Sequence, residues 1–236
     1  MLLNEKTALS TSRVLLVPYC KHHVPQYHEW MRDPTILEAT ASERLSLEEE
    51  YAMQESWRRD SNKLTFIVCA PVFSLVDNAK GLIAGLYDVS GMIGDVNMFL
   101  TTTEEDDNEE AKLVGELELM IAMRDNQGLG YGKGALLTFL RYITDHEEDI
   151  VTEFASAAGD SRKSQRLCLC ARIGEQNHRS IALFESVGFL KTSQKPGYFG
   201  EFELRHKPFS SEAVDALFAK YDIEAYAEMN YEGGQG

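Results

Sequence analysis

The feature that most constrains this 236-residue sequence is a glycine-rich turn between an apolar strand and an amphipathic helix. Residues 127–135 are Gln-Gly-Leu-Gly-Tyr-Gly-Lys-Gly-Ala; residues 113–123 before them have strand character, and the apolar residues from Leu136 to Leu140 have helical spacing. Glycines let backbone amides approach an anion closely, and the unpaired amides and dipole at the start of a helix favour negative charge. We therefore expect an α/β chain whose turn holds a phosphate group, with Lys133 supplying a further positive charge.

Two common phosphate-binding motifs fail on spacing. A dinucleotide-binding turn needs G-x-G-x-x-G, yet counting from Gly128 its last position is Lys133, and counting from Gly130 it is Ala135. A P-loop needs G-x-x-x-x-G-K-[ST], yet position 127 is Gln and position 134 is Gly. A turn whose glycines serve backbone geometry alone stays open as the alternative.

The charge balance limits the partners of the chain. Twenty-three basic and 38 acidic residues give a net charge of −15, so the average surface field repels nucleic acid and anionic membranes and attracts a cationic acceptor such as an amine. No stretch approaches the roughly 20 apolar residues that cross a bilayer, and four cysteines are too few for a disulfide scaffold. We expect a cytoplasmic protein with reduced thiols that binds neither nucleic acid nor membrane.

Short apolar runs predict the strands of one α/β domain. A hairpin is expected between residues 82–87 and 93–100, because Gly91 and Gly94 lie where the two segments meet. The full set of expected strands is 13–18, 64–69, 82–87, 93–100, 113–123, 166–173 and 199–205.

Helical spacing and end signals predict the helices between these strands. Ser46 and Glu49 have the form of a capping box at a helix start, Pro34 limits the first helix, and Gly188 follows the last. The expected helices are 24–31, 46–57, 132–144 and 177–187.

The remaining segments predict loops and a tail. Residues 101–110 carry six acidic side chains and no apolar one, which predicts an exposed loop. Residues 151–166 are polar and rich in small residues, which predicts a loop or a weakly helical insertion, and residues 211–229 have the pattern of an amphipathic helix. We expect a main domain over residues 1–206 and a partly helical tail over residues 207–236.

Two motifs resemble those of the GNAT superfamily of N-acetyltransferases. Gln127-x-x-Gly130-x-Gly132 is similar to the turn with which that family grips the pyrophosphate of acetyl-coenzyme A. The run Asn177-x-x-Ser180-Ile-x-Leu-Phe184-x-x-x-Gly188-Phe189 is similar to the second signature of the family. Segments 16–19, 27–31, 40–43, 49–54 and 94–97 resemble its N-acetyltransferase 9 branch, and the likeness covers residues 1–206.

The resemblance implies the GNAT fold, a mixed and strongly twisted central sheet with helices on both faces and a V-shaped cofactor cleft between two splayed parallel strands. It also implies acetyl-coenzyme A as cosubstrate, with its pantetheine arm paired to the strand before the turn. The cofactor-binding residues that it implies are Met120, Ile121, Ala122, Met123, Gln127, Gly128, Leu129, Gly130, Tyr131, Gly132, Lys133, Asn177, Ser180 and Phe184.

Transfer to an amine needs a base near the thioester, because only the neutral amine is a nucleophile. Glu116 and Glu118 are the candidates, since their spacing puts both on one face of the strand before the turn, where partial burial and like charge raise a carboxyl pKa. Glu116 is preferred because the family often places an acidic base about that far before the turn. A solvated polar strand face stays open as the alternative.

The resemblance implies further catalytic groups. The amide of Ile121 or Ala122 is expected to stabilise the oxyanion, and Asn177 to position the acetyl end of the cofactor. Many relatives have a tyrosine where this sequence has Phe184, which cannot protonate the departing thiolate. Either a strong acid is dispensable, since a thiol has a pKa of about 8.5, or Tyr198 or another tyrosine supplies the proton.

We expect N-acetyl transfer from acetyl-coenzyme A to a primary amine of a peptide or protein, by direct attack in a ternary complex. No metal is expected, because Cys168-x-Cys170 lacks a second paired motif. The alternative function is an acetyl-coenzyme A-binding or cytoskeleton-associated interaction protein with little turnover, which Phe184 and the acidic insertions favour. The sequence reveals neither the acceptor nor the oligomeric state.

Overall fold

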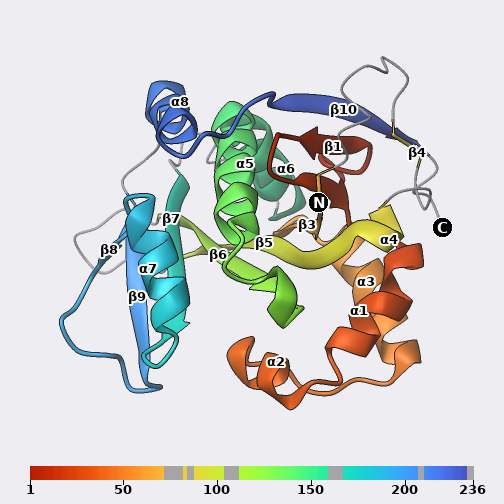
Figure 1. Cartoon of the computed structure of the whole chain (residues 1–236), viewed down its shortest axis with the longest axis horizontal. Helices are drawn as coiled ribbons and strands as arrows, with labels where there is room; N and C mark the ends of the chain where they lie inside the picture. The colour runs from red at the N-terminus through yellow and green to blue at the C-terminus, as the bar shows by residue number, and fades with distance from the viewer. Residues whose placement is uncertain (72–81, 84–87, 104–111, 159–166, 207–209, 233–236) are drawn as a thin grey trace.

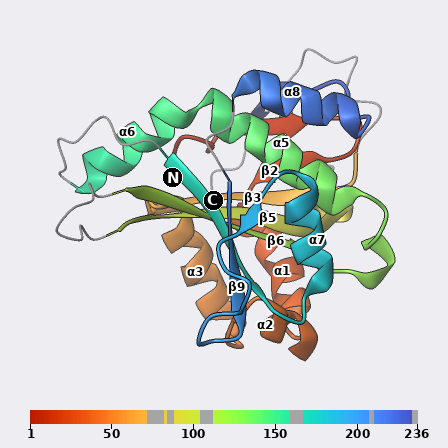
Figure 2. The ribbon, with the colours of Figure 1, turned by 90° about the vertical axis from the view of Figure 1, so that its left-hand side faces the viewer.

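A computed structural model describes residues 1–71, 82–83, 88–103, 112–158, 167–206 and 210–232, which form a mixed sheet with helices on both faces (Figures 1 and 2). The strand order in the sheet is β4-β10-β1-β2-β3-β5-β6-β7-β9-β8. The parallel pairs are β6 with β7 and β4 with β10, and the other pairs are antiparallel. The predicted α/β fold with a mixed central sheet is confirmed.

The strands of this sheet are mostly short, and the longest ones lie at its centre. Their bounds are β1 (Thr7–Ser10), β2 (Leu15–Pro18), β3 (Lys63–Cys69), β4 (Leu82–Ile83), β5 (Met92–Thr102), β6 (Leu113–Ile121), β7 (Leu167–Gly174), β8 (Leu190–Lys191), β9 (Glu201–His206) and β10 (Ala227–Glu232).

The helices connect these strands. Their bounds are α1 (Val24–Trp30), α2 (Pro34–Ala39), α3 (Leu47–Arg59), α4 (Asp88–Gly91), α5 (Tyr131–Asp145), α6 (Glu147–Ala158), α7 (His178–Ser186) and α8 (Ser211–Lys220). Two short 3-10 helices, η1 (Lys21–His23) and η2 (Arg124–Asn126), precede α1 and α5.

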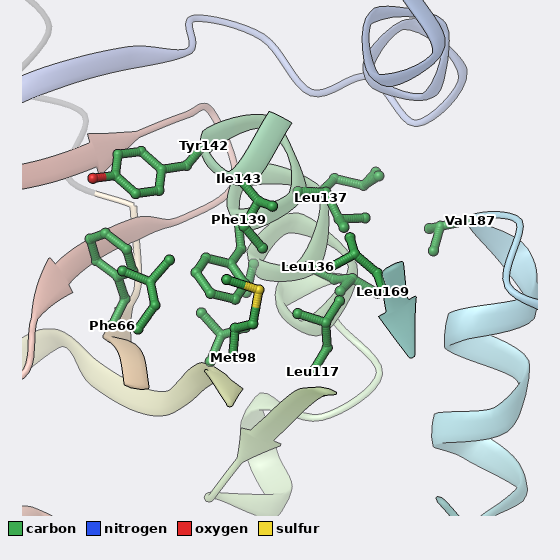
Figure 3. Close-up of a cluster of buried hydrophobic side chains, with 14 of the residues drawn as sticks. Phe66, Met98, Leu117, Leu136, Leu137, Phe139, Tyr142, Ile143, Leu169 and Val187 are labelled. Carbon is green, nitrogen blue, oxygen red and sulfur yellow. The ribbon is translucent and has the colours of Figure 1, made fainter. Parts of the chain in front are cut away.

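The two faces of the sheet are covered by different helices. Figure 2 shows α5, α6 and α8 on one face and α1, α2 and α3 on the other. The main core lies under α5, where Phe139 packs edge-on against Phe66 of β3 with ring centroids 5.9 Å apart, among side chains that include Met98 and Leu117 (Figure 3). Each fully buried side chain of this size stabilises the fold by about 1.5–3 kcal/mol.

Local signals place the helix starts on the α1 face. The predicted capping box is confirmed: the Glu49 amide donates to the Ser46 hydroxyl at 3.3 Å, and the Ser46 amide donates to the Glu49 carboxylate at 2.8 Å. Pro34, expected only to limit α1, instead opens α2, because Asp33 caps that helix by accepting from the Thr35 amide at 2.8 Å.

The predicted hairpin between residues 82–87 and 93–100 is wrong. β4 pairs in parallel with β10, and α4 lies between β4 and β5; residues 84–87 fall outside the described chain. Gly94 does not make a turn but lies inside β5, opposite Ile121 of β6, where a Cβ atom would overlap the carbonyl of Met120. The glycine therefore marks a close approach of two backbones.

The predicted tail helix over residues 211–229 is too long. α8 ends at Lys220, and Asp222 and Ala225 then adopt left-handed backbone angles, φ 51° and φ 57°, that break the helix. The chain continues as β10, which pairs with β1 in register Thr7 to Asn230. The helical pattern of the sequence hid a short alternating strand at its end.

The two expected insertions lie partly outside the described chain. Of the acidic segment 101–110, Thr101 and Thr102 end β5, and residues 104–110 are not described. Residues 147–158 form α6, which buries Ile150 on the core, so the first half of segment 151–166 is a packed helix. None of the helices in the described ranges is both long and apolar enough to cross a membrane.

The close approach at Gly94 generates a prediction about stability. Gly94→Ala forces β5 away from β6, so we expect the free energy of unfolding to fall by about 1–3 kcal/mol or more, measured by urea denaturation. Gly174→Ala in β7 is the matched control, because nothing lies within 4 Å of the Cβ it would add. Equal effects of the two changes would contradict the close approach.

Candidate active site

The strands β6 and β7 separate part of the way along their length. Their parallel pairing runs only from Leu113 and Leu167 to Glu116 and Cys170. Beyond that point β6 stays paired with β5 as far as Ile121, while β7 stays paired with β9. The two strands therefore diverge like a V.

The free edge of β6 faces this opening. The Ala122 amide donates to the Ile93 carbonyl of β5 at 2.9 Å, so this amide is not free to stabilise an oxyanion. Since amides alternate in direction along an antiparallel strand, those of Leu119 and Ile121 point to the opposite edge, toward the V. Ile121 is therefore the candidate that remains of the two expected donors. Next to it Met120 is buried, whereas Met123 is 49% exposed at the end of this edge.

The glycine turn lies between β6 and α5, and several of its backbone amides are unpaired among the described residues. Gly128 and Gly130 have φ of 78° and 92°, a conformation that side chains disfavour. The first helical bond of α5 runs from the Gly134 amide to the Gly130 carbonyl at 2.9 Å. In the described part of the chain the amides of Gly128, Leu129, Gly130, Tyr131, Gly132 and Lys133 have no hydrogen-bond acceptor.

The space in front of this turn suits an anion. A Cβ at Gly130 would meet nothing within 4 Å, and Leu129 is 60% exposed. Gly132 instead lies against the apolar side chains of Leu119 and Leu183, which join the turn to β6 and α7. Unpaired amides in a turn and at the helix start that follows it suit a diphosphate.

The side chain of Gln127 links the glycine turn to β6 and to α7. Its Nε2 donates to the Ile121 carbonyl at 2.9 Å, and its Oε1 accepts from Arg179 Nη1 of α7 at 3.0 Å. Arg179 brings a positive charge beside Gly128, with Nη2 3.8 Å from the position of a Cβ there. Sequence reasoning missed Arg179, although it lies inside the second GNAT-like motif.

The Lys133 ammonium lies over the ring of Tyr221. It is 3.8 Å from the ring centroid of Tyr221, which follows α8, and the Tyr221 hydroxyl donates to the Ser186 carbonyl at 2.7 Å. This cation–π contact attaches the segment after α8 to the start of α5. Lys133 therefore connects elements in addition to any contact with an anion.

The second motif forms the start of α7 beside the turn. Asn177 caps the helix, since its Oδ1 accepts from the Ser180 amide at 3.2 Å. Phe184 is buried, and its ring packs edge-on against Phe189 with centroids 5.1 Å apart. Asn177 and Ser180 are thus at the helix end, whereas the Phe184 ring lies in the core.

The two candidate bases differ in their partners. Glu116 forms an ion pair with Arg172 of β7, and Arg172 also reaches Glu203 of β9 at 3.5 Å. Burial raises the pKa of the Glu116 carboxyl, and the Arg172 charge acts against that rise. This ion pair bridges β6 and β7 at the point where they diverge.

Glu118 has no cation beside it in the described ranges. Its side chain reaches solvent, yet enough protein surrounds the carboxyl for burial to raise its pKa to about 7, together with the negative charges of Asp95, Glu116 and Glu201. A carboxyl that titrates near neutral pH suits a general base. Of the two candidates, Glu118 has the more suitable surroundings.

Tyr198 forms no hydrogen bond with these groups in the described part of the chain. It is 97% exposed in the segment between β8 and β9, and its ring contacts that of Phe199, which is 87% exposed. No hydrogen bond joins its hydroxyl to any described residue of the turn or of β6. The structure does not bring Tyr198 together with the other predicted catalytic residues.

A cluster of metal-ligating types lies elsewhere, at the start of α1. Sγ of Cys20 and ring nitrogens of His22 and His23 lie within 4.8 Å of one another. The Cys20 amide donates to His23 Nδ1 at 3.0 Å, so Nε2 carries the proton and faces Asp88 Oδ2 at 3.3 Å. Tyr231 donates to the same carboxylate at 2.5 Å. This tautomer fits a hydrogen-bonded attachment of β10, and the expectation of no metal stays a prediction.

Comparison with known proteins gives one consistent family. The family model described as Acetyltransferase (GNAT) domain matches residues 13–190. An N-acetyltransferase 9-like protein of Nematostella vectensis is 37% identical over 96% of this chain and 100% of its own. Proteins named alpha/beta-tubulin-N-acetyltransferase 9 are 35% identical in Drosophila melanogaster, over 94% and 97% of the two chains, and 38% in Homo sapiens, over 87% and 85%.

Solved structures show the same fold at low identity. An aminoglycoside acetyltransferase in complex with coenzyme A has a TM-score of 0.53 and 13% identity, covering 88% of this chain and 98% of that one. An acetyltransferase of the GNAT family from Bacillus anthracis has a TM-score of 0.51 and 12% identity, covering 84% and 97%.

The contacts of Gln127 generate a prediction about binding. Gln127→Ala removes two hydrogen bonds that hold the turn, each worth about 1 kcal/mol, so we expect coenzyme A to bind roughly 30-fold more weakly by isothermal titration calorimetry. Gln194→Ala, an exposed glutamine between β8 and β9, is the control. Undiminished affinity in the Gln127 variant would show that the turn is not the binding site.

Proposed function

The chain belongs to the GNAT family of acetyltransferases, in its N-acetyltransferase 9-like branch, and we propose that it transfers the acetyl group of acetyl-coenzyme A to a primary amine of a protein. The observation that carries this proposal is the divergence of β6 from β7, which puts free strand amides, an anion-binding turn and the Glu118 carboxyl around one opening. The amine attacks directly in a ternary complex.

The residues of the opening suit the cofactor in separate parts. The unpaired amides of the turn, with Arg179 beside them, bind the diphosphate. The outward amides of the β6 edge, near Leu119 and Ile121, pair with the amide groups of the pantetheine arm. Asn177, which caps the start of α7, is proposed to position the acetyl end of the cofactor. When bound, acetyl-coenzyme A supplies an activated acetyl group.

Glu118 acts as the general base. It accepts a proton from the ammonium form of the acceptor, which leaves a neutral amine that attacks the acetyl carbonyl carbon. The Ile121 amide donates to the carbonyl oxygen as it gains negative charge. The carbon–sulfur bond then breaks, the second amine proton leaves with the thiolate as the thiol, and Glu118 returns its proton to water.

No tyrosine is needed for the leaving group in this scheme. Phe184 has no proton to donate and lies in the core, and Tyr198 is almost fully exposed. A thiol with a pKa of about 8.5 leaves as the anion without a strong acid. The departing sulfur takes its proton from the attacking nitrogen.

The acceptor is proposed from the relatives. Two of them are named alpha/beta-tubulin-N-acetyltransferase 9, so an amine of tubulin is the first acceptor to test, in the cytoplasm. The net charge of −15 suits a cationic ammonium group as the local target. Mass spectrometry of tubulin and of a peptide library, after incubation with acetyl-coenzyme A, identifies the acetylated amine. Cofactor binding without any acyl transfer would instead favour a non-catalytic interaction protein.

The roles of the two glutamates generate a prediction about rate. Glu118→Gln removes the base, so we expect kcat/KM to fall at least 100-fold, whereas Glu116→Gln, which loses an ion pair, should cost less than tenfold. Coenzyme A affinity serves as the control and should be unchanged in Glu118→Gln. A larger loss in the Glu116 variant would assign the base to Glu116.

The proposed base also predicts the pH dependence of the rate. Because burial raises the pKa of Glu118 to about 7 and only the carboxylate accepts a proton, kcat/KM should rise with pH up to and through about 7. A profile of kcat/KM from pH 5 to pH 9 measures this limb. A rate that is independent of pH between 6 and 8 would exclude a base with this pKa.

A further inference from the structure

A buried carboxylate lies on the strand next to Glu118 without a charged partner. Asp95 of β5 is 2% exposed. Its Oδ2 accepts from Asn97 Nδ2 at 2.8 Å and from the Tyr27 hydroxyl at 3.3 Å, and its Oδ1 has no hydrogen-bond partner. Within the described ranges no lysine, arginine or histidine forms an ion pair with it.

The register of β5 against β6 puts this group beside the proposed base. Asn97 is directly opposite Glu118, and Asp95 is opposite Met120, two residues further along β6. Since side chains alternate between faces, Asp95, Asn97 and Glu118 share the face that α1 covers. A diagonal neighbour on one face lies roughly 7–8 Å away, within reach of charge interaction.

Asn97 is left with an unused oxygen. Its nitrogen donates to Asp95, which as a carboxylate can only accept, and this contact decides the orientation of the amide. Its Oδ1 is buried and has no partner in the described part of the chain. A buried hydrogen-bond acceptor without a partner costs about 1–3 kcal/mol of folding free energy. A hydrogen-bond donor placed beside Asn97 Oδ1 would remove this cost.

Stability does not account for the arrangement. A buried carboxylate that accepts hydrogen bonds from two neutral donors, and has one oxygen without a partner, destabilises a fold. Removing its charge from water is costly, and no nearby cation in the described part of the structure offsets that cost. Beside Asp95, the Tyr27 ring packs against the rings of Tyr19 and Trp30. The free energy of unfolding therefore does not explain why a carboxylate is buried here.

We propose that Asp95 and Asn97 are positioning residues for Glu118: Asp95 holds the Asn97 amide by its nitrogen, which leaves the amide oxygen to accept the proton of Glu118 once that carboxyl is protonated. The inference rests on the proposed function, in which Glu118 takes one proton from the acceptor ammonium. The proton remains on Glu118, shared with Asn97 Oδ1, until it leaves to water, so no further reactant is needed.

The charges around the two carboxyls act in the same direction. The negative charge of Asp95 raises the pKa of Glu118, as do Glu116 on the same strand and Glu201 on β9. Burial raises the pKa of Asp95 itself to about 6, against the lowering effect of its Asn97 and Tyr27 hydrogen bonds. Glu50 of α3 lies near Tyr19 and Tyr27. Nδ1 of His28, which belongs to α1, lies 3.8 Å from Glu50 Oε1.

The test replaces each of the two residues and follows Glu118 in two ways. Asp95→Asn removes the negative neighbour and the anchor of the amide, and Asn97→Ala removes the acceptor, so both changes should lower the pKa of Glu118. We expect the acid limb of kcat/KM to move down by about one pH unit in each variant. The titration of the Glu118 side-chain carbon by NMR, assigned with Glu118→Gln, should move down equally.

Glu55→Gln is the matched control, because it removes one exposed carboxylate of α3 that pairs only with Arg59. It should leave both midpoints unchanged. The melting temperature of Asp95→Asn should not fall, since a merely structural role predicts a fall and no change in titration. An unmoved Glu118 midpoint in either variant overturns the proposal, and so does loss of folding in both.

The NMR titration separates this inference from the proposed function. If the wild-type protein transfers no acetyl group to any amine, the proposed function fails, yet a lowered Glu118 midpoint in both variants still supports the coupling. If transfer occurs and neither midpoint nor limb moves, the function stands and the positioning role is wrong.

Discussion

The separation of β6 from β7 beyond Glu116 and Cys170 is the constraint on which the rest of the structure depends. Because β5 holds β6 on one side and β9 holds β7 on the other, each strand keeps one satisfied edge and exposes the other. An exposed strand edge inside a protein is costly unless water or a ligand satisfies it. The turn at Gln127 then adds unpaired amides at the same opening, which makes the whole arrangement suited to an extended ligand with a phosphate end.

The two glutamates of β6 show how different surroundings give identical side chains different contacts and charges. Glu116 lies at the point of divergence, where Arg172 bridges it to Glu203, and this ion pair ties three strands together below the opening. Glu118 lies two residues further along, past the last residue pair that β6 shares with β7, and burial, together with the carboxylates of Asp95, Glu116 and Glu201, raises its pKa. A carboxylate in an ion pair and a carboxyl with a raised pKa thus occupy neighbouring positions on one face of one strand.

Much of this could be predicted from the sequence, because the signals were local. The capping box of Ser46 and Glu49, the apolar run of β3 and the glycine turn each depend on nearby residues, and the GNAT-like motifs gave the fold. What failed depended on distant pairing. Gly94 suggested a turn because the sequence does not show that Met120 lies against it, and β10 was read as helix because its partner β1 is over 200 residues away.

The residues of the candidate site also fall into two groups. Local sequence patterns indicate some of them, and the others depend on contacts between distant parts of the chain. The sequence indicates the turn and the pair Glu116 and Glu118 as candidates, because their spacing is regular along one strand and one helix start, and on the family resemblance it favours Glu116. The ion pair of Glu116, the bond of Arg179 to Gln127 and the buried Asp95 were not found, because each joins elements that only the folded sheet brings together. The preference between Glu116 and Glu118 therefore had to come from three-dimensional contacts.

We propose that the β6 edge and the glycine turn together bind the acetyl carrier through backbone amides. Backbone amide NMR of the labelled protein during titration with coenzyme A tests it most directly. We expect the largest shifts, and protection from hydrogen exchange, on the amides of residues 128–133 together with Leu119 and Ile121. Shifts confined to other elements, with these amides unmoved at saturation, would contradict it.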